Sequence, residues 1–268
     1  MKILFLGDVV GISGRSMVLK NLLSKIKDEK IDFVIVNGEN AADSGVGLTE
    51  EICKDFFNCG VDVITTGNHV WDQKETMSHI EKENRLLRPK NFFEPSPGKG
   101  FGIFTAKNNM KVGVLNLMGN VFMKKSEDVF KVAEKFMQKY KLKDDYDFLI
   151  VDFHGETTSE KTAMGHFFDG KATLVVGTHT HIPTNDARVL KNGTAYQTDA
   201  GMCGDYDSVI GMNKENSINR FLSKKSTKHF PTIGEASLSG VIIVCDIETG
   251  LAKNIESFIY GGDLKNSH

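Results

Sequence analysis

The sequence contains little cysteine and none of the spacings that build disulfide frameworks or thiolate metal sites. Its 268 residues include four cysteines, and no two of them form a C-x-x-C pair. This scarcity argues against a small secreted scaffold and against a structural zinc site of the cysteine type. We therefore expect four reduced thiols in or near the core, at Cys53, Cys59, Cys203 and Cys245.

The chain also lacks a long apolar run and an excess of charge of either sign. Its first apolar run, Ile3–Leu6, is too short to span a membrane and lacks the layout of a signal peptide, so we expect a cytoplasmic protein with no membrane partner. The 33 basic and 35 acidic residues nearly cancel, which leaves no general field for a nucleic-acid backbone. We expect no stable nucleic-acid complex, and any bound anion must be held locally.

Nucleotide-binding glycine motifs are missing as well. The glycine-rich stretch G-D-V-V-G-I-S-G-R, residues 7–15, matches neither G-x-x-x-x-G-K-[ST] nor G-x-G-x-x-G. A nucleoside-triphosphate or dinucleotide loop is therefore disfavoured, and we interpret the stretch as a turn that carries a ligand.

The apolar pattern that is present indicates an α/β protein. Short β-branched runs alternate with amphipathic stretches in the first half, and two pairs of runs flank the turn sequences Asn108-Asn109 and Glu248-Thr249-Gly250. A parallel start followed by hairpins predicts either one mixed sheet or two sheets packed face to face with helices outside. At this length we expect a single domain over residues 1–268. The strand runs are Ile3–Leu6, Phe33–Val36, Val61–Thr65, Val112–Leu117, Phe148–Val151, Leu174–Val176 and Val241–Val244.

Three stretches between these runs are expected to be helical. The first has an apolar stripe at helical spacing, made by Val18, Leu19, Leu22, Leu23 and Ile26. The other two begin with a hydroxyl residue followed by acidic residues, which is typical of a capped helix start. The predicted caps are Thr49 and Ser126.

The informative feature is where the polar residues lie. Five apolar runs each end in a short polar cluster, and in open α/β sheets the ligand crevice lies just beyond the carboxyl ends of the strands. Carboxylate, amide and imidazole groups of this kind are donors for iron, manganese or zinc. Eight donors are too many for one open catalytic centre, so two ions are expected. The candidates are Asp8, Glu39, Asn40, Asn68, His69, His154, His179 and His181.

Each donor taken alone has a plainer interpretation. Asp8 could cap a following helix, Asn68 sits in an ordinary turn sequence, and a single histidine such as His154 is more often structural than a ligand. The set is harder to explain in this way. In an extended segment the pair His179 and His181 would place two imidazoles on the same side, at the edge reached by the other clusters.

Six motifs follow one another along the chain. They are G-D-V-V-G at Asp8, Asn37-Gly38-Glu39-Asn40, Gly67-Asn68-His69, Trp71-Asp72, the stretch from His154 to Lys161, and the stretch from Gly177 to Thr184. In these motifs the chain resembles the YmdB family, a bacterial branch of the calcineurin-like metallophosphoesterases. The resemblance runs from Met1 to about Tyr260 and follows the motifs in order.

The resemblance implies a four-layer α-β-β-α sandwich with two mixed sheets and a two-metal centre that is usually described with iron. It also implies hydrolysis of 2',3'-cyclic nucleotides and is compatible with a homo-oligomer. Carried over by motif, Glu39 would bridge the ions and His69 would stay unliganded as the proton donor. The superfamily's opening D-x-H is absent because position 10 is Val10, and Asn40 would then supply the missing donor. One ion would be held by Asp8, Glu39, Asn40 and His181, and the other by Glu39, Asn68, His154 and His179.

The expected reaction is attack of water on a phosphodiester, with His69 protonating the departing oxygen because histidine can carry a proton near neutral pH. Asp72, three residues later, is either a partner that orients His69 or a surface turn residue. Two other functions stay open: a phosphomonoesterase or protein phosphatase on the same centre, and a non-catalytic nucleotide sensor that uses the metals only for binding.

Overall fold

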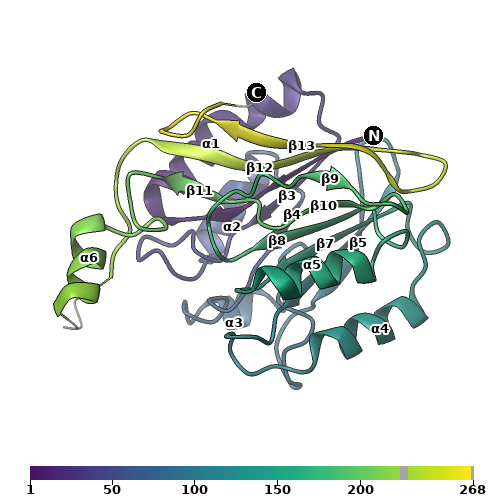
Figure 1. Ribbon diagram of the computed structural model, residues 1–268, viewed down its shortest axis with the longest axis horizontal. Coiled ribbons are helices and arrows are strands. Elements are labelled where there is room, and N and C mark those ends of the chain that lie inside the picture. Colours follow the sequence, from purple (N-terminus) through teal and green to yellow (C-terminus); the bar gives the residue numbers. More distant parts are fainter. Residues whose placement is uncertain (224–228, 267–268) are drawn as a thin grey trace.

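Two β-sheets lie face to face in the computed structural model, which describes residues 1–223 and 229–266, and helices cover the outer face of each sheet (Figure 1). Both sheets contain parallel and antiparallel pairs. Of the two arrangements left open by the apolar pattern, the second is therefore correct, and the expected four-layer α-β-β-α sandwich is confirmed. The interpretation of residues 1–268 as one domain stays a prediction.

The first sheet has seven strands in the order β2-β11-β12-β1-β3-β4, with β13 paired to β12. β1, β3 and β4 run parallel, so their carboxyl ends lie at one edge, and the expected hairpin is formed by β12 and β13. The strands are β1 (Lys2–Leu6), β2 (Asp8–Val9), β3 (Phe33–Asn37), β4 (Val63–Thr65), β11 (Met202–Asp205), β12 (Ala236–Cys245) and β13 (Ala252–Tyr260).

The second sheet has six strands in the order β5-β6-β7-β8-β10-β9. β6, β7, β8 and β10 are parallel, and β5 forms the other expected hairpin with β6. The strands are β5 (Phe101–Thr105), β6 (Lys111–Met118), β7 (Phe148–His154), β8 (Leu174–Thr178), β9 (Arg188–Val189) and β10 (Ala195–Gln197).

The helices pack against the outer faces of the sheets. α1 and α2 cover the seven-stranded sheet, α4 and α5 cover the six-stranded sheet, and α6 projects from the body of the molecule (Figure 1). The helices are α1 (Gly11–Asp28), α2 (Glu50–Asn58), α3 (Thr76–His79), α4 (Val129–Lys139), α5 (Thr158–Phe167) and α6 (Lys214–Ser223). In the described part of the chain, no helix is both long and apolar enough to cross a membrane.

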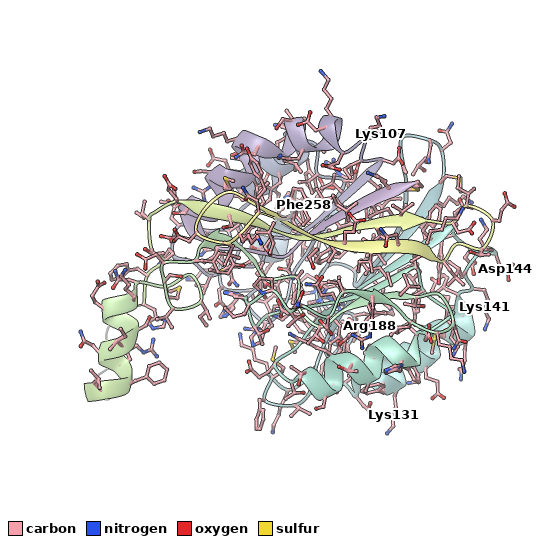
Figure 2. The ribbon with its side chains drawn as sticks, turned by 45° about the horizontal axis from the view of Figure 1, so that its top comes forward. Lys107, Lys131, Lys141, Asp144, Arg188 and Phe258 are labelled. Atoms are coloured by element: carbon pink, nitrogen blue, oxygen red, sulfur yellow. The ribbon has the colours of Figure 1, made fainter. Side chains whose placement is uncertain are left out.

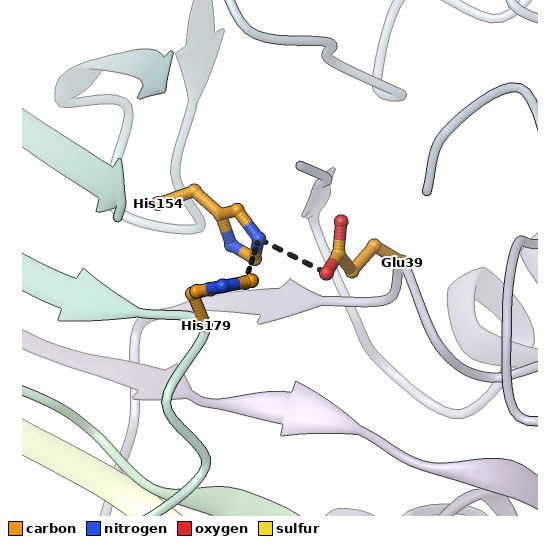
Figure 3. Close-up of side chains that lie close together, drawn as sticks. All are labelled: Glu39, His154 and His179. Atoms are coloured by element: carbon orange, nitrogen blue, oxygen red, sulfur yellow. Dashed lines mark hydrogen bonds and ion pairs between the residues drawn. The ribbon is translucent and has the colours of Figure 1, made fainter. Parts of the chain in front are cut away.

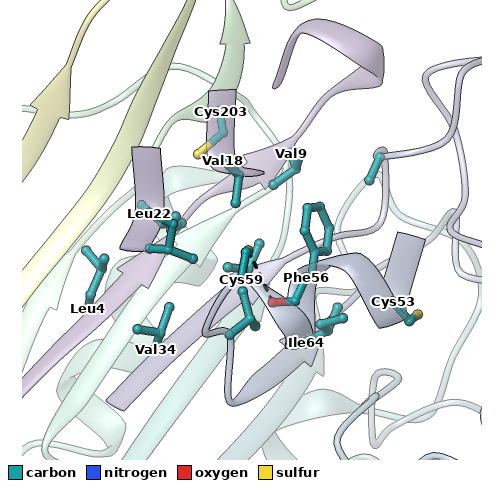
Figure 4. Packing of buried hydrophobic residues seen from close by; sticks show 14 of the residues in the cluster. Leu4, Val9, Val18, Leu22, Val34, Cys53, Phe56, Cys59, Ile64 and Cys203 are labelled. Atoms are coloured by element: carbon teal, nitrogen blue, oxygen red, sulfur yellow. Dashed lines mark hydrogen bonds between the residues drawn. The ribbon is translucent and has the colours of Figure 1, made fainter. Parts of the chain in front are cut away.

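Three apolar layers hold the sandwich together. Phe5 and Ile35 of the first sheet meet Val114 and Ile150 of the second in the central layer. Outside the first sheet, residues such as Phe56 of α2 pack on its strands (Figure 4). A third cluster lies beneath α4 and α5. Charged side chains such as Lys131 and Lys141 lie on the outside of the molecule, whereas Phe258 is fully buried (Figure 2). The four cysteines are free and buried, as expected.

The expected helices form, with two differences in detail. In α1 the buried stripe consists of Val18, Leu22 and Ile26, whereas Leu23 is 59% exposed. Leu23 directly follows Leu22, so its side chain is turned away from the face of α1 that packs on the sheet.

The two predicted caps have different outcomes. Thr49 caps α2 by accepting a hydrogen bond from the amide of Ile52, as predicted. Ser126 does not cap α4: the cap is Asp128, which accepts from the amides of Phe130 and Lys131. The hydroxyl of Ser126 instead accepts hydrogen bonds from asparagine side chains.

We predict that Asp128→Ala lowers the free energy of unfolding by about 1 kcal/mol, the usual contribution of a side-chain cap. The carboxylate of Asp128 satisfies two amides at the start of α4 that alanine would leave without a partner. Urea denaturation measures the change. Glu134→Ala is the control, because Glu134 is exposed in the middle of the same helix. Equal stability of the two variants would show that Asp128 contributes nothing as a cap.

Candidate active site

The polar clusters at the carboxyl ends of the strands meet at one place, although they come from both sheets. Glu39 and Asn40 follow β3, Asn68 follows β4, and Asp8 begins β2 in the seven-stranded sheet. His154 ends β7 in the six-stranded sheet, and His179 and His181 follow β8. The seven residues expected to bind metal form one connected cluster, and His69 lies beside it.

One half of the cluster is centred on the Nε2 atom of His154. This atom lies 3.0 Å from Oε1 of Glu39, 3.0 Å from Oδ1 of Asn68 and 3.1 Å from Nδ1 of His179. Figure 3 shows the side chains of Glu39, His154 and His179 pointing toward one another. Their potential ligand atoms lie within 4.8 Å of one another, so these three residues form a candidate metal-binding group.

The other half of the cluster shares Glu39 with the first. Nδ2 of Asn40 lies 3.3 Å from Oε1 of Glu39 and 3.2 Å from Nε2 of His181. Oδ1 of Asp8 lies 3.9 Å from Nε2 of His181 and 3.8 Å from Nδ1 of His154. Glu39 and Asp8 thus each lie beside both halves, and the shorter contacts of Glu39 give it the position expected of a bridging ligand.

Two oxygen atoms in the cluster are buried without a hydrogen-bond partner: Oδ1 of Asp8 and Oδ1 of Asn40. A buried polar atom without a partner costs free energy, so each such atom calls for an explanation. A cation between these oxygens and the neighbouring imidazoles supplies one, and the set of oxygen and nitrogen donors suits it. The plainer interpretation of Asp8 as a helix cap is wrong, because α1 has no side-chain cap and Oδ2 accepts from the amide of His179.

The titration of these groups reflects their burial and mutual contact. Burial alone would raise the pKa of Glu39, but the charge and hydrogen bond of His154 outweigh it and lower this pKa to about 2. Burial alone would lower the pKa of His154, but nearby carboxylates, led by Glu39, raise it to about 9. Burial and the charge of His154 lower the pKa of His179 to about 3. Burial also raises the pKa of Asp8. The positive charge of His154 therefore keeps the buried Glu39 carboxylate ionised.

Hydrogen bonds behind two of the histidines orient their rings. Thr178 donates its hydroxyl proton to Asp152, at 2.7 Å, so it can only accept from Nδ1–H of His154, at 2.9 Å. Nδ1 of His181 donates to the carbonyl of Ile210 at 2.8 Å. In both rings Nε2 is the atom that faces the cluster, and this is how partners behind a ligand fix its orientation.

Asp152 was missed in the sequence, although a signal was present. It is an acidic residue inside a fully buried strand, two positions before His154 and hence on the same face. Its carboxylate accepts from Thr65 and Asn37 as well as Thr178, and burial raises its pKa to about 7.

The segment that carries His179 and His181 is not extended, so that part of the prediction is wrong. β8 ends at Thr178, and φ is 94° at His179 and 66° at His181. The turn is held from behind by Asp199, which accepts from the amide and hydroxyl of Thr180 and from Lys161 at 2.6 Å. The two imidazoles reach the cluster because this turn is fixed, and not because of strand periodicity.

His69 lies at the margin of the cluster. Its amide donates to Oε2 of Glu39 at 3.1 Å, and its Nδ1 lies 2.7 Å from Oδ2 of Asp72. Both interpretations of Asp72 therefore hold, because it is a partner of His69 and also an exposed turn residue. The side chain of His69 is 31% exposed, and among the described residues none binds its Nε2. This nitrogen remains available to a bound molecule.

Three further charged residues lie around the cluster, and no local pattern in the sequence indicates their contacts. Nζ of Lys124 donates to the carbonyl of Asn68 at 2.6 Å. Oε2 of Glu156 lies 3.1 Å from Nε2 of His179. The carboxylate of Glu160 accepts from two amides of a neighbouring loop.

Gly67 has no side chain, and this leaves space for His154 and Glu39 to meet in the cluster. A Cβ atom at this position would collide with the imidazole of His154 and with Oε2 of Glu39. We predict that Gly67→Ala weakens metal affinity by about 10- to 100-fold, the range seen when groups next to a ligand are altered. Elemental analysis after dialysis against known metal concentrations measures the effect.

Gly204→Ala is the matched control, because a Cβ there meets only ordinary contacts, the nearest being Sδ of Met202 at 3.4 Å. Circular dichroism shows whether each variant is folded. Metal binding by a folded Gly67→Ala protein equal to that of wild type would contradict the proposed role of the cluster.

Comparison with known proteins shows the family to which the chain belongs. Residues 4–258 match the family model described as YmdB-like protein. The chain is 44% identical over 264 residues to the 2',3'-cyclic-nucleotide 2'-phosphodiesterase of Bacillus subtilis, covering 98% of both chains. It is 41% identical over 258 residues to a putative phosphatase/phosphodiesterase of Mycoplasma pneumoniae, covering 93% of this chain and 89% of that protein.

Two solved structures have the same fold. A novel phosphatase from Mycoplasma pneumoniae superposes with a TM-score of 0.91 at 37% identity, covering 98% of this chain and 94% of that one. A hypothetical protein from Thermus thermophilus superposes with a TM-score of 0.90 at 36% identity, covering 98% of this chain and 100% of that one. Because the family model matches residues 4–258, which is nearly the whole chain, the chain belongs to the YmdB-like protein family.

Proposed function

We propose that this protein is a metal-dependent phosphodiesterase that hydrolyses 2',3'-cyclic nucleotides, breaking the bond to the 2'-oxygen and leaving a 3'-phosphate. The observation that carries the proposal is the buried Glu39 carboxylate, which is shared by two groups of donors while His69 stands outside both. A protein that only bound metal would not need the additional histidine at the margin.

Two metal ions fit the donors. One would be held by Asp8, Glu39, Asn40 and His181, and the other by Glu39, Asn68, His154 and His179, with Glu39 bridging them. The cluster contains carboxylate, amide and imidazole groups and no thiolate. Such a set of donors suits iron, with manganese or zinc as alternatives. When bound, the ions would offset the negative charge of the phosphate and lower the pKa of water, so that a nucleophile exists at neutral pH.

The chain's own residues account for the remaining chemistry. As the oxygen of water adds to phosphorus, the bond to the 2'-oxygen breaks and that oxygen requires a proton. His69 is the proton donor, because its Nε2 is available and Asp72 holds its Nδ1. Lys124 places an ammonium group at the backbone carbonyl of Asn68, the residue before His69. The positive charge at this position favours binding of an anionic substrate.

The substrate class comes from the relative in Bacillus subtilis, whose name is 2',3'-cyclic-nucleotide 2'-phosphodiesterase. The relative named phosphatase/phosphodiesterase in Mycoplasma pneumoniae keeps a second candidate open, a phosphomonoesterase on the same centre. The four buried free thiols are compatible with a reducing compartment, and a cytoplasmic location remains a prediction. A homo-oligomer and the absence of a stable nucleic-acid complex also remain predictions.

The test of the proposal combines metal content with product identity. After reconstitution with iron, manganese or zinc, we expect close to two ions per chain by elemental analysis. We expect 2',3'-cyclic AMP to be converted into 3'-AMP, as identified by ³¹P NMR. Formation of 2'-AMP, or no hydrolysis by the loaded protein, would refute the proposed reaction. Faster hydrolysis of p-nitrophenyl phosphate than of any diester would favour the phosphomonoesterase.

The role of His69 can be tested separately. His69→Ala is expected to keep the metal content of wild type and to lower kcat on 2',3'-cyclic AMP by about 10²- to 10⁴-fold, the usual contribution of a general acid or base. Asp72→Asn, which keeps the imidazole but removes its carboxylate partner, should cause a smaller loss.

His166→Ala is the control for these variants, because His166 is exposed on α5 and has no place in the cluster. Wild-type turnover by His69→Ala would remove His69 from the mechanism. Loss of metal from that variant would instead mean that His69 acts as a ligand.

A further inference from the structure

The loop between β6 and α4, residues 119–127, borders the candidate active site. At its start the amide of Gly119 donates to the carbonyl of His154 at 2.9 Å. Further along, Nζ of Lys124 donates to the carbonyl of Asn68 at 2.6 Å. His154 and Asn68 are themselves in contact through their side chains at 3.0 Å. The loop therefore begins at one member of the cluster and returns to another.

Two side chains hold the ends of this loop, the buried Glu160 and the exposed Asn120. The carboxylate of Glu160 accepts from the amides of Asn120 and Val121, at 2.8 and 3.3 Å. The side chain of Asn120 donates to the carbonyl of Glu127 and accepts from the amide of Val129, so it ties the loop to the start of α4. These bonds fix where the loop lies, and a group that it presents is thereby preorganised.

Phe122 is the group presented between these anchors. Its side chain is 86% exposed, and its φ is 60°, a conformation that is a genuine outlier for a bulky residue. Neither the exposure of the ring nor the positive φ stabilises the fold. Strained positions of this kind are concentrated at sites that bind ligands, where the surrounding structure maintains them. Val121, next to it, is also 45% exposed.

The position of Phe122 limits its distance from the cluster. It is two residues from Lys124 and three from Gly119, so its Cα lies within roughly 7 Å and 11 Å of theirs, even for a fully extended chain. A nucleotide whose phosphate is held at the cluster extends its base over a comparable span. Aromatic side chains bind bases by stacking, and every base has a face for this contact.

We propose that Phe122 is the nucleobase-binding residue of the site and stacks on the base of the cyclic nucleotide. The inference rests on the proposed function and adds to it how the enzyme distinguishes a nucleotide from other cyclic phosphates. The two anchors hold the backbone of Phe122 in a loop that borders the cluster, while the metal ligands and His69 would act on the phosphate. Because stacking tolerates all bases, the site should favour nucleotides over base-free esters without a strict preference among bases.

The experiment compares two substrates of the metal-loaded enzyme: 2',3'-cyclic AMP and the 2',3'-cyclic phosphate of methyl ribofuranoside, which has no base. Wild type should have a higher kcat/KM for the nucleotide. Phe122→Ala should reduce the ratio of the two kcat/KM values by roughly 5- to 150-fold, the range of base–aromatic stacking, mainly through KM. Phe122→Trp should restore the ratio, because the indole also stacks.

Phe221→Ala is the matched control: Phe221 is 81% exposed on the projecting helix α6, and the ratio should stay at the wild-type value (Figure 1). Saturation-transfer NMR with 3'-AMP gives a readout that does not depend on turnover. The adenine protons should receive saturation from wild type and much less from Phe122→Ala.

The outcomes separate the two levels of the proposal. Hydrolysis of both substrates by wild type with equal kcat/KM, or an unchanged ratio in folded Phe122→Ala, overturns the stacking role and leaves the phosphodiesterase intact. Hydrolysis of neither substrate refutes the proposed function itself, and the base-binding role with it.

Discussion

The arrangement of the site depends on one buried charge, the carboxylate of Glu39. It is fully removed from water, and burial of a carboxylate costs several kcal/mol unless a cation and hydrogen bonds compensate for it. Here the compensation comes from His154, from the side chain of Asn40 and from the amide of His69. These three partners follow different strands, so the requirement to satisfy Glu39 also brings the ends of those strands together.

Much of the architecture could be predicted because it is encoded locally. Short, continuous β-branched runs mark the strands, and the hairpin turns at Asn108-Asn109 and Glu248-Thr249-Gly250 are marked by residue types that favour turns. The donors were found because polar residues follow the carboxyl ends of the strands, where ligands bind in α/β proteins. The meeting of Glu39 and His154 also depends on how the two sheets pack, because these residues belong to different sheets. The assignment of donors to each ion, and of His69 as proton donor, came from family resemblance, since spacing alone left those roles open.

The parts that could not be predicted depend on contacts between distant segments. The turn at His179 and His181 is fixed by Asp199 and Lys161, whose pairing no local pattern indicates. In the sequence Lys124 is an ordinary surface lysine, and only the fold brings Asn68 beside it. At the start of α4, several neighbouring residues were suitable caps, and only the backbone geometry selects Asp128 over Ser126.

The placement of the donors across both sheets has a consequence for the assembly of the protein. Asp8 and His179 are 171 positions apart, and the donors from β3 and β7 belong to different layers of the sandwich. No half of the chain contains either complete set of proposed ligands, so high-affinity metal uptake would come after the sheets have docked. A bound cation would then link the two sheets across their apolar interface. Because the unfolded chain has no such site, the binding free energy would stabilise the native state alone.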